Sequence, residues 1–596
     1  MKTPSRFVAA LVLGFALAGP VWAGGPPNPT MSDATHSNAG GTNALFNNTG
    51  FYNTAFGESA LLNNNTGQQN TATGFRALAG NTNGVNNTAN GFEALTSNNS
   101  GSGNTAAGNE ALVSNTTGSS NTANGTTALF RNSTGISNTA TGAAALFSNT
   151  SGGENTADGL SALRANTIGN DNTAVGVGAM TDNTTGSNNA AAGASALEDN
   201  TIGNYNAAFG AGALELNVSG INNTAVGSDA LQDNNGANNT ADGTNALQDN
   251  RTGSDNTATG ADALQENTAS NNTTDGANAL ENNTTGSSNT ATGFSALFSN
   301  TIGGANTATG VNALQKNTTG FDETAIGMMA LQNNTTGAYN TAAGASALGH
   351  NTTGNQNTGV GQAALSQNTT GGFNTASGLN ALFSNINGNS NTAVGLSALH
   401  NSTSGNNNIG LGANAGFFST TGSNNIDIGN TGVAAESNTV RIGTKGVQKA
   451  AFIAGISGTL VTGDSVLVNS SGQLGIVMSS ARYKHDIQGM DDASSNLMKL
   501  RPVTFRYKRD PNGARQYGLI AEEVVQVYPE LVGYGPDGKV QTVRYQELIP
   551  MLLNEVQKQN RENRRLEAQL VQLKGLFQRA MAAQGNGHRL QTAFNR

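Results

Sequence analysis

The chain contains no cysteine and has little of what usually builds a thick core or a charged surface. Its 596 residues include one tryptophan, 10 prolines, 5% aromatic residues and 11% charged residues, and only 36% of them are hydrophobic. Without cysteine, disulfides cannot hold the protein together outside a cell. A composition this poor in hydrophobic residues also argues against several conventional globular domains. The stability of the protein must therefore come from regular packing and from assembly.

Basic residues are scarce in the first 478 positions. Residues 479–596 hold 18 of the 28 lysines and arginines but only 12 of the 37 acidic residues, which leaves net charges of −15 before residue 479 and +6 from there on. Phosphate binding requires clustered lysine and arginine, so the acidic part does not fit a nucleic-acid-binding protein. The basic excess falls on a predicted helix, where a solvated face explains it.

Long apolar runs are absent after the first 20 residues. At the N-terminus, Lys2 and Arg6 precede an apolar run over residues 7–18, and Val21-Trp22-Ala23 offers small residues at the cleavage positions. This pattern predicts a signal peptide over residues 1–23, followed by a linker over 24–37. We therefore expect a secreted or cell-surface protein. No later segment reaches the ~20 apolar residues of a membrane span, so we expect none.

What the chain has instead is a repeat of about 17 residues over positions 38–430. The motif Asn-Thr-Ala-x-Gly starts every 17 residues from Asn53 to Asn223, and single 16-residue steps at Asn239 and Asn272 interrupt a series that reaches Asn425. An Ala-Leu pair follows the leading asparagine by seven and eight residues in nearly every unit. A fixed short period is typical of a solenoid, in which each unit packs only on its neighbours.

The segments between turn signals are too short for helices. Each unit has one turn at its motif glycine and another at a sequence such as Asn317-Thr318-Thr319-Gly320, which leaves only a few residues between turns. Short strands with stacked asparagine and threonine ladders fit this pattern. The sequence thus predicts a mainly β protein with a parallel β-solenoid fibre. Its 23 units from Asn53 to Asn425, at ~4.8 Å per coil, give a length of about 110 Å.

The set of apolar side chains that points into each predicted coil is small. It consists of the motif alanine and the Ala-Leu pair, which together bury little apolar area, so a single column should be only marginally stable. We expect three columns side by side to share a core.

The coils resemble the head repeats of trimeric bacterial adhesins in architecture and strand-turn motif, although those repeats are shorter. The resemblance implies a fibre that binds a surface glycan or a host-cell ligand. The alternating strands of an outer-membrane barrel anchor do not follow the C-terminal helix, so we do not expect attachment by that route.

Three other interpretations of the repeat have less support. The frequent Asn-x-Thr and Asn-x-Ser triplets could be glycosylation sites, but they keep the 17-residue phase, which favours turns and ladders. A calcium-binding repeat would need aspartate in every unit. A glycosidase or lyase would need paired carboxylates on adjacent coils, whereas Asp158 and Asp242 share a repeat position but stand five units apart. We therefore expect no metal and no cofactor.

Residues 431–478 are predicted to form a β neck. Residues 438–443 and 452–456 alternate like strands, and residues 465–477 are typical of a hairpin that turns at Ser470-Ser471-Gly472. The neck carries no catalytic pattern, so we expect it to join the fibre to the C-terminal part.

Three motifs follow in order, at residues 479–487 (Ser-Ser-Ala-Arg-Tyr-Lys-His-Asp-Ile), 500–507 (Leu-Arg-Pro-Val-Thr-Phe-Arg-Tyr) and 516–524 (Gln-Tyr-Gly-Leu-Ile-Ala-Glu-Glu-Val). Together they resemble the intramolecular chaperone auto-processing domain at the end of phage endosialidases and tailspikes. The resemblance covers about residues 479–580 and implies a small α/β domain over residues 479–545. In that family the domain trimerises the fibre, assists its folding and then cuts itself off with a Ser/Lys dyad.

Ser479 and Lys484 occupy the two dyad positions. A serine hydroxyl becomes a nucleophile when a nearby base takes its proton, and a lysine becomes such a base once burial lowers its pKa. This chemistry needs no cofactor and makes the chain at most a single-turnover self-cleaving serine peptidase. Ser480 is an alternative nucleophile, and His485 or Glu522 could assist. A domain that templates the trimer without cutting remains the alternative.

Residues 546–583 are predicted to form a coiled-coil helix. Positions 552, 556, 559, 563, 566, 570, 573 and 577 alternate in steps of four and three and hold mostly apolar residues, with polar layers at Gln559 and Asn563. A helix packed on its own domain is the alternative. Gly585 and Gly587 should end the helix, and residues 584–596 should form a flexible tail. The number of three chains comes from the resemblance.

We therefore expect a homotrimeric fibre of the adhesin or tail-fibre kind, with a C-terminal trimerising chaperone that releases itself next to Ser479. The other class of function is a passive structural or ice-binding β-solenoid with a non-cleaving terminal domain. An ice-binding protein should place threonine at a fixed outward position of each coil, as the second residue of the motif would allow.

Overall fold

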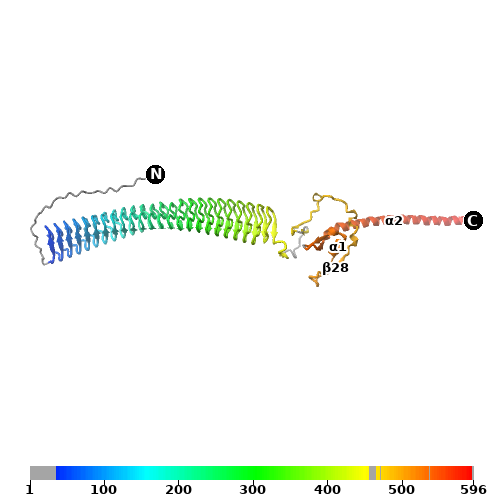
Figure 1. Cartoon of the computed structure of the whole chain (residues 1–596), viewed down its shortest axis with the longest axis horizontal. Helices are drawn as coiled ribbons and strands as arrows, with labels where there is room; N and C mark the ends of the chain where they lie inside the picture. The colour runs from blue at the N-terminus through cyan, green and yellow to red at the C-terminus, as the bar shows by residue number, and fades with distance from the viewer. Residues whose placement is uncertain (1–34, 455–464, 470, 536, 594–596) are drawn as a thin grey trace. The chain divides into compact units, whose positions relative to one another are not determined.

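The computed structural model describes residues 35–593 except 455–464, 470 and 536, with side chains up to residue 583. The predicted signal peptide over residues 1–23 lies outside this range. Two compact units make up the chain and divide after Phe452. The first is a solenoid and the second contains the C-terminal helix, and each is described by itself (Figure 1).

The first unit is a single parallel sheet of 25 strands, each three residues long, which confirms the predicted β-solenoid. The strands are β1 (Asn38–Gly40), β2 (Thr54–Phe56), β3 (Thr71–Thr73), β4 (Thr88–Asn90), β5 (Thr105–Ala107), β6 (Thr122–Asn124), β7 (Thr139–Thr141), β8 (Thr156–Asp158), β9 (Thr173–Val175), β10 (Ala190–Ala192), β11 (Ala207–Phe209), β12 (Thr224–Val226), β13 (Thr240–Asp242), β14 (Thr257–Thr259), β15 (Thr273–Asp275), β16 (Thr290–Thr292), β17 (Thr307–Thr309), β18 (Thr324–Ile326), β19 (Thr341–Ala343), β20 (Thr358–Val360), β21 (Thr375–Ser377), β22 (Thr392–Val394), β23 (Ile409–Leu411), β24 (Ile426–Ile428) and β25 (Val440–Ile442). Successive strands pair in register, and the 16-residue step to β13 keeps it, because Thr224 still faces Thr240.

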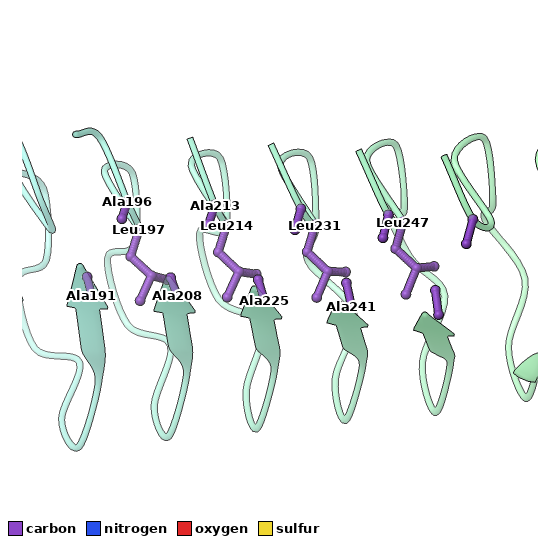
Figure 2. Close-up of a cluster of buried hydrophobic side chains, with 14 of the residues drawn as sticks. Ala191, Ala196, Leu197, Ala208, Ala213, Leu214, Ala225, Leu231, Ala241 and Leu247 are labelled. Atoms are coloured by element: carbon purple, nitrogen blue, oxygen red, sulfur yellow. The ribbon is translucent and has the colours of Figure 1, made fainter. Parts of the chain in front are cut away.

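The core is a column of alanines and leucines inside the coils. In one coil, Ala225 of β12 and the turn residues Ala230 and Leu231 are all completely buried. Figure 2 shows the leucine side chains of successive turns reaching toward the strand alanines. The strand alanines point inward because side chains alternate across a strand, which leaves the first and third residues outside. The expectation that three columns share a core is wrong, because each coil encloses its own apolar residues.

Two asparagine ladders fix the turns of the solenoid. Asn121 donates its Nδ2 to Oδ1 of Asn104 one coil back at 3.1 Å and to the carbonyl of Gly135 at 2.9 Å. Asn132 donates to the same carbonyl at 3.2 Å. A Cβ on Gly135 would lie 2.4 Å from the carbonyl oxygen of Gly152 in the next coil, so only glycine fits between stacked turns. The predicted ladders are therefore present, with asparagine bonded inside the coils.

The neck differs from its prediction in two places. The expected strand around residue 440 is β25, which pairs with β24 and so belongs to the solenoid sheet. Residues 452–454 form no strand, and the rest of the expected strand at 452–456 lies outside the described residues. The predicted hairpin is confirmed by the antiparallel pair β26 (Leu467–Val468) and β27 (Leu474–Gly475). Asn469 Oδ1 accepts hydrogen bonds from the backbone N–H of Ser471 and Gln473 in its turn.

The C-terminal unit is a small mixed module followed by a long helix. Its elements are η1 (Ala481–Tyr483), η2 (Asp491–Ser494), η3 (Leu497–Lys499), β28 (Val503–Phe505), β29 (Gln516–Gly518), α1 (Ala521–Val527), η4 (Pro529–Leu531), β30 (Val532–Tyr534), β31 (Val540–Val543) and α2 (Tyr545–Ala593). β28 pairs with β29 and β30 with β31, both antiparallel. Among the helices that the structure describes, none combines the length and apolar character needed to cross a membrane.

The helix α2 corrects the predicted end of the coiled coil. The sequence predicted a helix over residues 546–583 and a flexible tail over 584–596, but α2 continues through Gly585 and Gly587 to Ala593. Glycine inside a helix costs about 1 kcal/mol relative to alanine, which weakens a long helix without breaking it. No proline follows these glycines to force an end.

Candidate functional site

The two predicted dyad residues lie together at the start of the C-terminal motif. A single 3₁₀ turn, η1, separates Ser479 from Lys484, and the Lys484 N–H closes this turn on the carbonyl of Ala481 at 3.1 Å. The turn brings the Lys484 side chain back over the serine, and its Nζ donates to Ser479 Oγ at 3.2 Å. This distance is within the reach expected of a nucleophile and its base.

Both dyad side chains are exposed in the single chain. In the observed contact Lys484 Nζ donates to the serine hydroxyl, whereas a base would accept the proton of that hydroxyl. Burial of an amine favours its neutral form, which is the form that can act as a base. The contact between the two side chains is therefore present in one chain, whereas burial of Lys484 is not.

The structure distinguishes the other candidates from this pair. Ser480 precedes η1 and makes no capping hydrogen bond with its side chain. The His485 ring approaches Asp486, with Nδ1 2.7 Å from Oδ2, and both side chains point into solvent. Glu522 is exposed in the first turn of α1. In the contacts described for this chain, neither His485 nor Glu522 reaches Ser479 or Lys484.

A small apolar core supports the module beside the dyad. Val524 of α1, Tyr528 directly after it, and the strand residues Val532 and Val543 are buried in it together with Leu497, Leu531 and Met551. Met551 comes from the first turns of α2, so this part of the helix belongs to the module. The Tyr545 hydroxyl at the helix start accepts a hydrogen bond from the Leu519 N–H at 2.8 Å.

A polar cluster fastens α2 to the segment that follows the dyad motif. Ser494 donates to Glu555 at 2.6 Å, and Lys558 Nζ lies 3.0 Å from the same carboxylate. These two hydrogen bonds, from Ser494 first, hold the pKa of Glu555 below its usual value. Asn554 also donates to the carbonyl of Asp491 at 2.9 Å. The helix is therefore anchored to the module over its first turns, up to about Lys558.

The remaining turns of α2 display the predicted seam without a partner. Leu566 and Leu570 are half exposed, at 51% and 50%, and Leu573 and Phe577 are more than 60% exposed. The polar seam residues Gln559 and Asn563 are exposed as well. Because this seam touches no other part of the described chain, the alternative of a helix packed on its own domain applies only to its first turns.

The two candidate carboxylates of the solenoid lie far from each other. Asp158 and Asp242 are the outward third residues of β8 and β13, and five coils at ~4.8 Å each separate them by about 24 Å. The residues that the structure describes include no cluster of three or more histidines and carboxylates able to hold a metal.

Two buried carboxylates of the solenoid, Glu323 and Asp427, were missed in the sequence. Glu323 takes the place of a ladder asparagine and is 1% exposed. Its Oε1 accepts a hydrogen bond from Asn340 at 2.9 Å, while its Oε2 has no partner. Burial raises its pKa to about 8. The signal for Glu323 was the sequence Glu323-Thr324-Ala325, in which the motif is intact except for its first residue.

Comparison with known proteins supports the C-terminal assignment. Residues 479–533 match the family model described as the chaperone of endosialidase. The match begins at Ser479 and ends within β30, so it covers the dyad and most of the small module. A search of curated proteins gives no match to this chain. The chain therefore combines a β-solenoid with a C-terminal domain of the endosialidase chaperone type.

Proposed function

We propose that this protein is an exported, homotrimeric fibre whose C-terminal domain templates assembly and then releases itself by a cut next to Ser479. The observation that carries the proposal is the 3.2 Å contact between Lys484 Nζ and Ser479 Oγ. It lies at the first residue of the chaperone match and directly after the neck. A cut there separates the solenoid from the module and leaves each intact.

The proposed reaction is an acyl transfer within the chain. Neutral Lys484 takes the hydroxyl proton of Ser479 while Oγ attacks the carbonyl carbon of Met478. The bond between that carbon and the Ser479 nitrogen then breaks, and the nitrogen receives the proton. The product is an ester between Met478 and Ser479 Oγ with a free α-amine. Water hydrolyses this ester and yields a fibre ending at residue 478 and a fragment beginning at Ser479.

The cut is tested by mass analysis of purified variants. Wild-type protein should yield fragments of about 478 and 118 residues, counted from the sequence, the first shortened further if the signal peptide is removed. Ser479→Ala and Lys484→Ala should remain full length, and Lys484→Arg should not restore cutting because arginine keeps its proton. Ser480→Ala is the matched control and should be processed like the wild type. Processing of Ser479→Ala at the wild-type rate would rule out Ser479 as the nucleophile.

The exposed seam of α2 supports assembly with other copies of the chain. Four large apolar side chains at heptad spacing from Leu566 to Phe577 need a partner helix to leave water. The polar layers at Gln559 and Asn563 would set the register of the helices. The number of three rests on the chaperone family that the module resembles.

Export is the part of the proposal that depends on the sequence alone. The apolar run over residues 7–18 supports a signal peptide that ends at Ala23. N-terminal sequencing of protein from the culture medium or the cell surface should therefore find Gly24 first. The ligand that we propose for the fibre is a surface glycan or another host-cell component.

A second candidate function is ice binding by the solenoid. Threonine is the first, outward residue of 19 of the 25 strands. No hydroxyl of this column has a hydrogen-bond partner in the described part of the chain, whereas threonines on the turns, such as Thr167, donate to a carbonyl of the next coil. Free hydroxyls repeating at ~4.8 Å form a regular array for ordered water. Ice recrystallisation should be inhibited by the wild type but not by Thr273→Lys/Thr290→Lys, with Ser299→Lys on a turn as control.

A further inference from the structure

The last three strands of the solenoid differ from the others in carrying Ile, Leu or Val at both outward positions. In the body of the solenoid the first outward residue of most strands is threonine and the inward residue is alanine, while the third residue varies and is apolar in some strands, such as Val226 of β12. In β23, β24 and β25 the outward positions are all Ile, Leu or Val, and the inward ones are Gly410, Asp427 and Arg441. We call the six outward residues the end patch: Ile409, Leu411, Ile426, Ile428, Val440 and Ile442.

This difference is not a slip of register. The three strands continue the same in-register pairing, with Ile409 facing Ile426 and Ile426 facing Val440. A slip by one residue would move every side chain to the other face of the sheet. The inward polar groups are also satisfied where they stand. Asp427 accepts a hydrogen bond from Ser419 at 3.3 Å, and Arg441 forms a two-pronged ion pair with Glu436 at 2.6 and 2.7 Å.

The end patch is open to solvent in the single chain. Val440 and Ile442 are 62% and 74% exposed, and Ile409 and Leu411 are 39% and 46% exposed. Val447 and Phe452, which follow it within the same unit, are themselves largely exposed. An exposed group of branched apolar side chains at one end of an otherwise threonine-rich face marks an interaction surface.

The absence of charge favours other copies of the chain as the partner. Near the axis of a cyclic trimer each residue lies close to its own copies, so a charged residue at such a contact meets like charge. The end patch has no charged residue at its outward positions, whereas Asp158, Asp242 and Asp275 face outward on earlier strands. A second apolar surface without a partner, the seam of α2, lies on the same chain beyond the neck. Both apolar surfaces leave water when the same copies of the chain contact each other at the end patch and at the seam of α2.

We propose that the end patches of three copies pack together and hold the solenoids in register at the C-terminal end of the fibre, the yellow end of the solenoid in Figure 1. This proposal rests on the trimer proposed above and adds where the solenoids touch. Its consequence concerns the cut: cleavage before Ser479 removes the α2 seam but leaves the end patch on the fibre. The end patch is then what keeps the released fibre trimeric.

The area of the end patch determines what it contributes to assembly beside the seam of α2. A stable interface buries roughly 800 Å² on each partner, and six side chains over three strands fall short of that area. The end patch therefore does not start assembly from free monomers. It holds three solenoids that α2 has already brought together, at the high effective concentration that tethering provides.

The first test compares the oligomeric state before and after release. The variant Leu411→Thr/Val440→Thr/Ile442→Thr restores the threonine pattern that the other strands tolerate, and Val226→Thr/Val360→Thr is the matched control at outward positions of the body. Both full-length variants should sediment as trimers. If self-cutting is absent, a protease site placed in the neck releases the fibre. After release, the end-patch variant should dissociate at a concentration at least tenfold higher than the control does.

The second test detects contact between end patches of different copies by cysteine cross-linking. Because the chain has no cysteine, Ile442→Cys introduces the only thiol, and mild oxidation of the full-length trimer should join chains through it. Phe418→Cys, an exposed position on a turn of the same end, should not cross-link. A wild-type chain that is monomeric throughout would overturn the proposed trimer itself. A stable trimer in which Ile442→Cys fails to cross-link, or in which the released threonine variant stays trimeric, would overturn the end-patch contact alone.

Discussion

The leucine of each coil is held in a backbone conformation that side chains rarely adopt. Leu231 has a φ of 52°, and the equivalent leucines of other coils have nearly the same value. The left-handed region costs a residue other than glycine roughly 1–2 kcal/mol. Complete burial of a leucine side chain contributes about 1.5–3 kcal/mol. The two effects are of similar size, so the leucine column adds only a small net stability per coil, and the ladders must supply the rest.

The first prediction at this scale concerns the asparagine ladder. Asn121→Ala removes an amide that donates to Asn104 and Gly135 and whose Oδ1 accepts from the N–H of Asn138 at 3.0 Å. A buried polar group left without a partner costs about 1–3 kcal/mol, so the solenoid should lose stability of that order. Thermal unfolding followed by circular dichroism measures the loss. Asn124→Ala, at an outward position of the same coil, is the control and should change the melting temperature little.

The second prediction concerns Glu323. Its carboxyl titrates near 4.5 in the unfolded chain and at about 8 in the fold, chiefly because of burial, with a smaller contribution from the nearby Asp322 charge. Below pH 4.5 both states are protonated and the fold loses nothing. As pH rises toward 8 only the unfolded state releases the proton, so stability falls by about 1.4 kcal/mol per pH unit. Above pH 8 the loss is complete.

The isosteric variant Glu323→Gln cannot titrate and serves as the reference. The melting temperature of the wild type relative to this variant should decrease from pH 4.5 to pH 8 and then level off. Glu323→Asn restores the ladder residue and should be the most stable of the three at neutral pH. A wild-type curve parallel to that of Glu323→Gln over the whole range would contradict the assignment of a buried neutral carboxyl.

At the scale of elements, α2 has two parts with different roles. Its first turns belong to the module, because Met551 is in the module core and Lys558 contacts the segment after the dyad motif. The later turns carry only the exposed seam. Deleting the whole helix from residue 546 would therefore damage the module as well as remove the exposed seam. A truncation after Asn560 separates the two roles.

The third prediction follows from this division. Truncation after Asn560 removes the seam, and the double change Leu570→Asp/Leu573→Asp places charges in it that would lose their water and repel the charges of the other copies. Either change should abolish trimers of the uncut chain. Val571→Asp is the matched control, since Val571 is also an exposed apolar residue of this helix but lies off the seam. Analytical ultracentrifugation distinguishes the outcomes. Normal trimers from the double variant would mean that the seam is not the assembly surface.

The repeat made the elements of the solenoid predictable, because period, turn residues and inward alanines all point to the same coil. The closed core of a single column was not predicted, because counting inward residues does not reveal that stacked turns exclude water completely. The end of the solenoid was misjudged for a related reason. Val440-Arg441-Ile442 places its apolar residues outside, so it looked like a separate strand pair rather than one more coil. The family resemblance, rather than the spacing alone, paired Ser479 with Lys484; the structure shows their contact and also that both side chains are exposed.

At the scale of the whole molecule, charge is kept away from the outward face of the sheet. Only Asp158, Asp242 and Asp275 occupy outward strand positions, and no lysine or arginine does. The other acidic residues of the solenoid lie on its turns, inside its ladders like Glu323, or inside a strand like Asp427 of β24. This distribution leaves one long face on which solenoids of net negative charge can approach each other with little repulsion.

The last prediction concerns the order of assembly and cutting. In the single chain Ser479 and Lys484 are in contact but exposed, whereas a lysine acts as a base in its neutral form, which burial favours. If neighbouring chains cover Lys484 on assembly, its neutral form becomes available only in the trimer. Cutting should then follow trimerisation, so dilution during refolding should slow it, and Leu570→Asp/Leu573→Asp should block it although the dyad is untouched. Conversely, Ser479→Ala should trimerise normally while remaining uncut.

Refolding over a hundredfold range of protein concentration, with the uncut fraction measured on denaturing gels, tests this order. A cutting rate that does not change with concentration would place the reaction in the monomer.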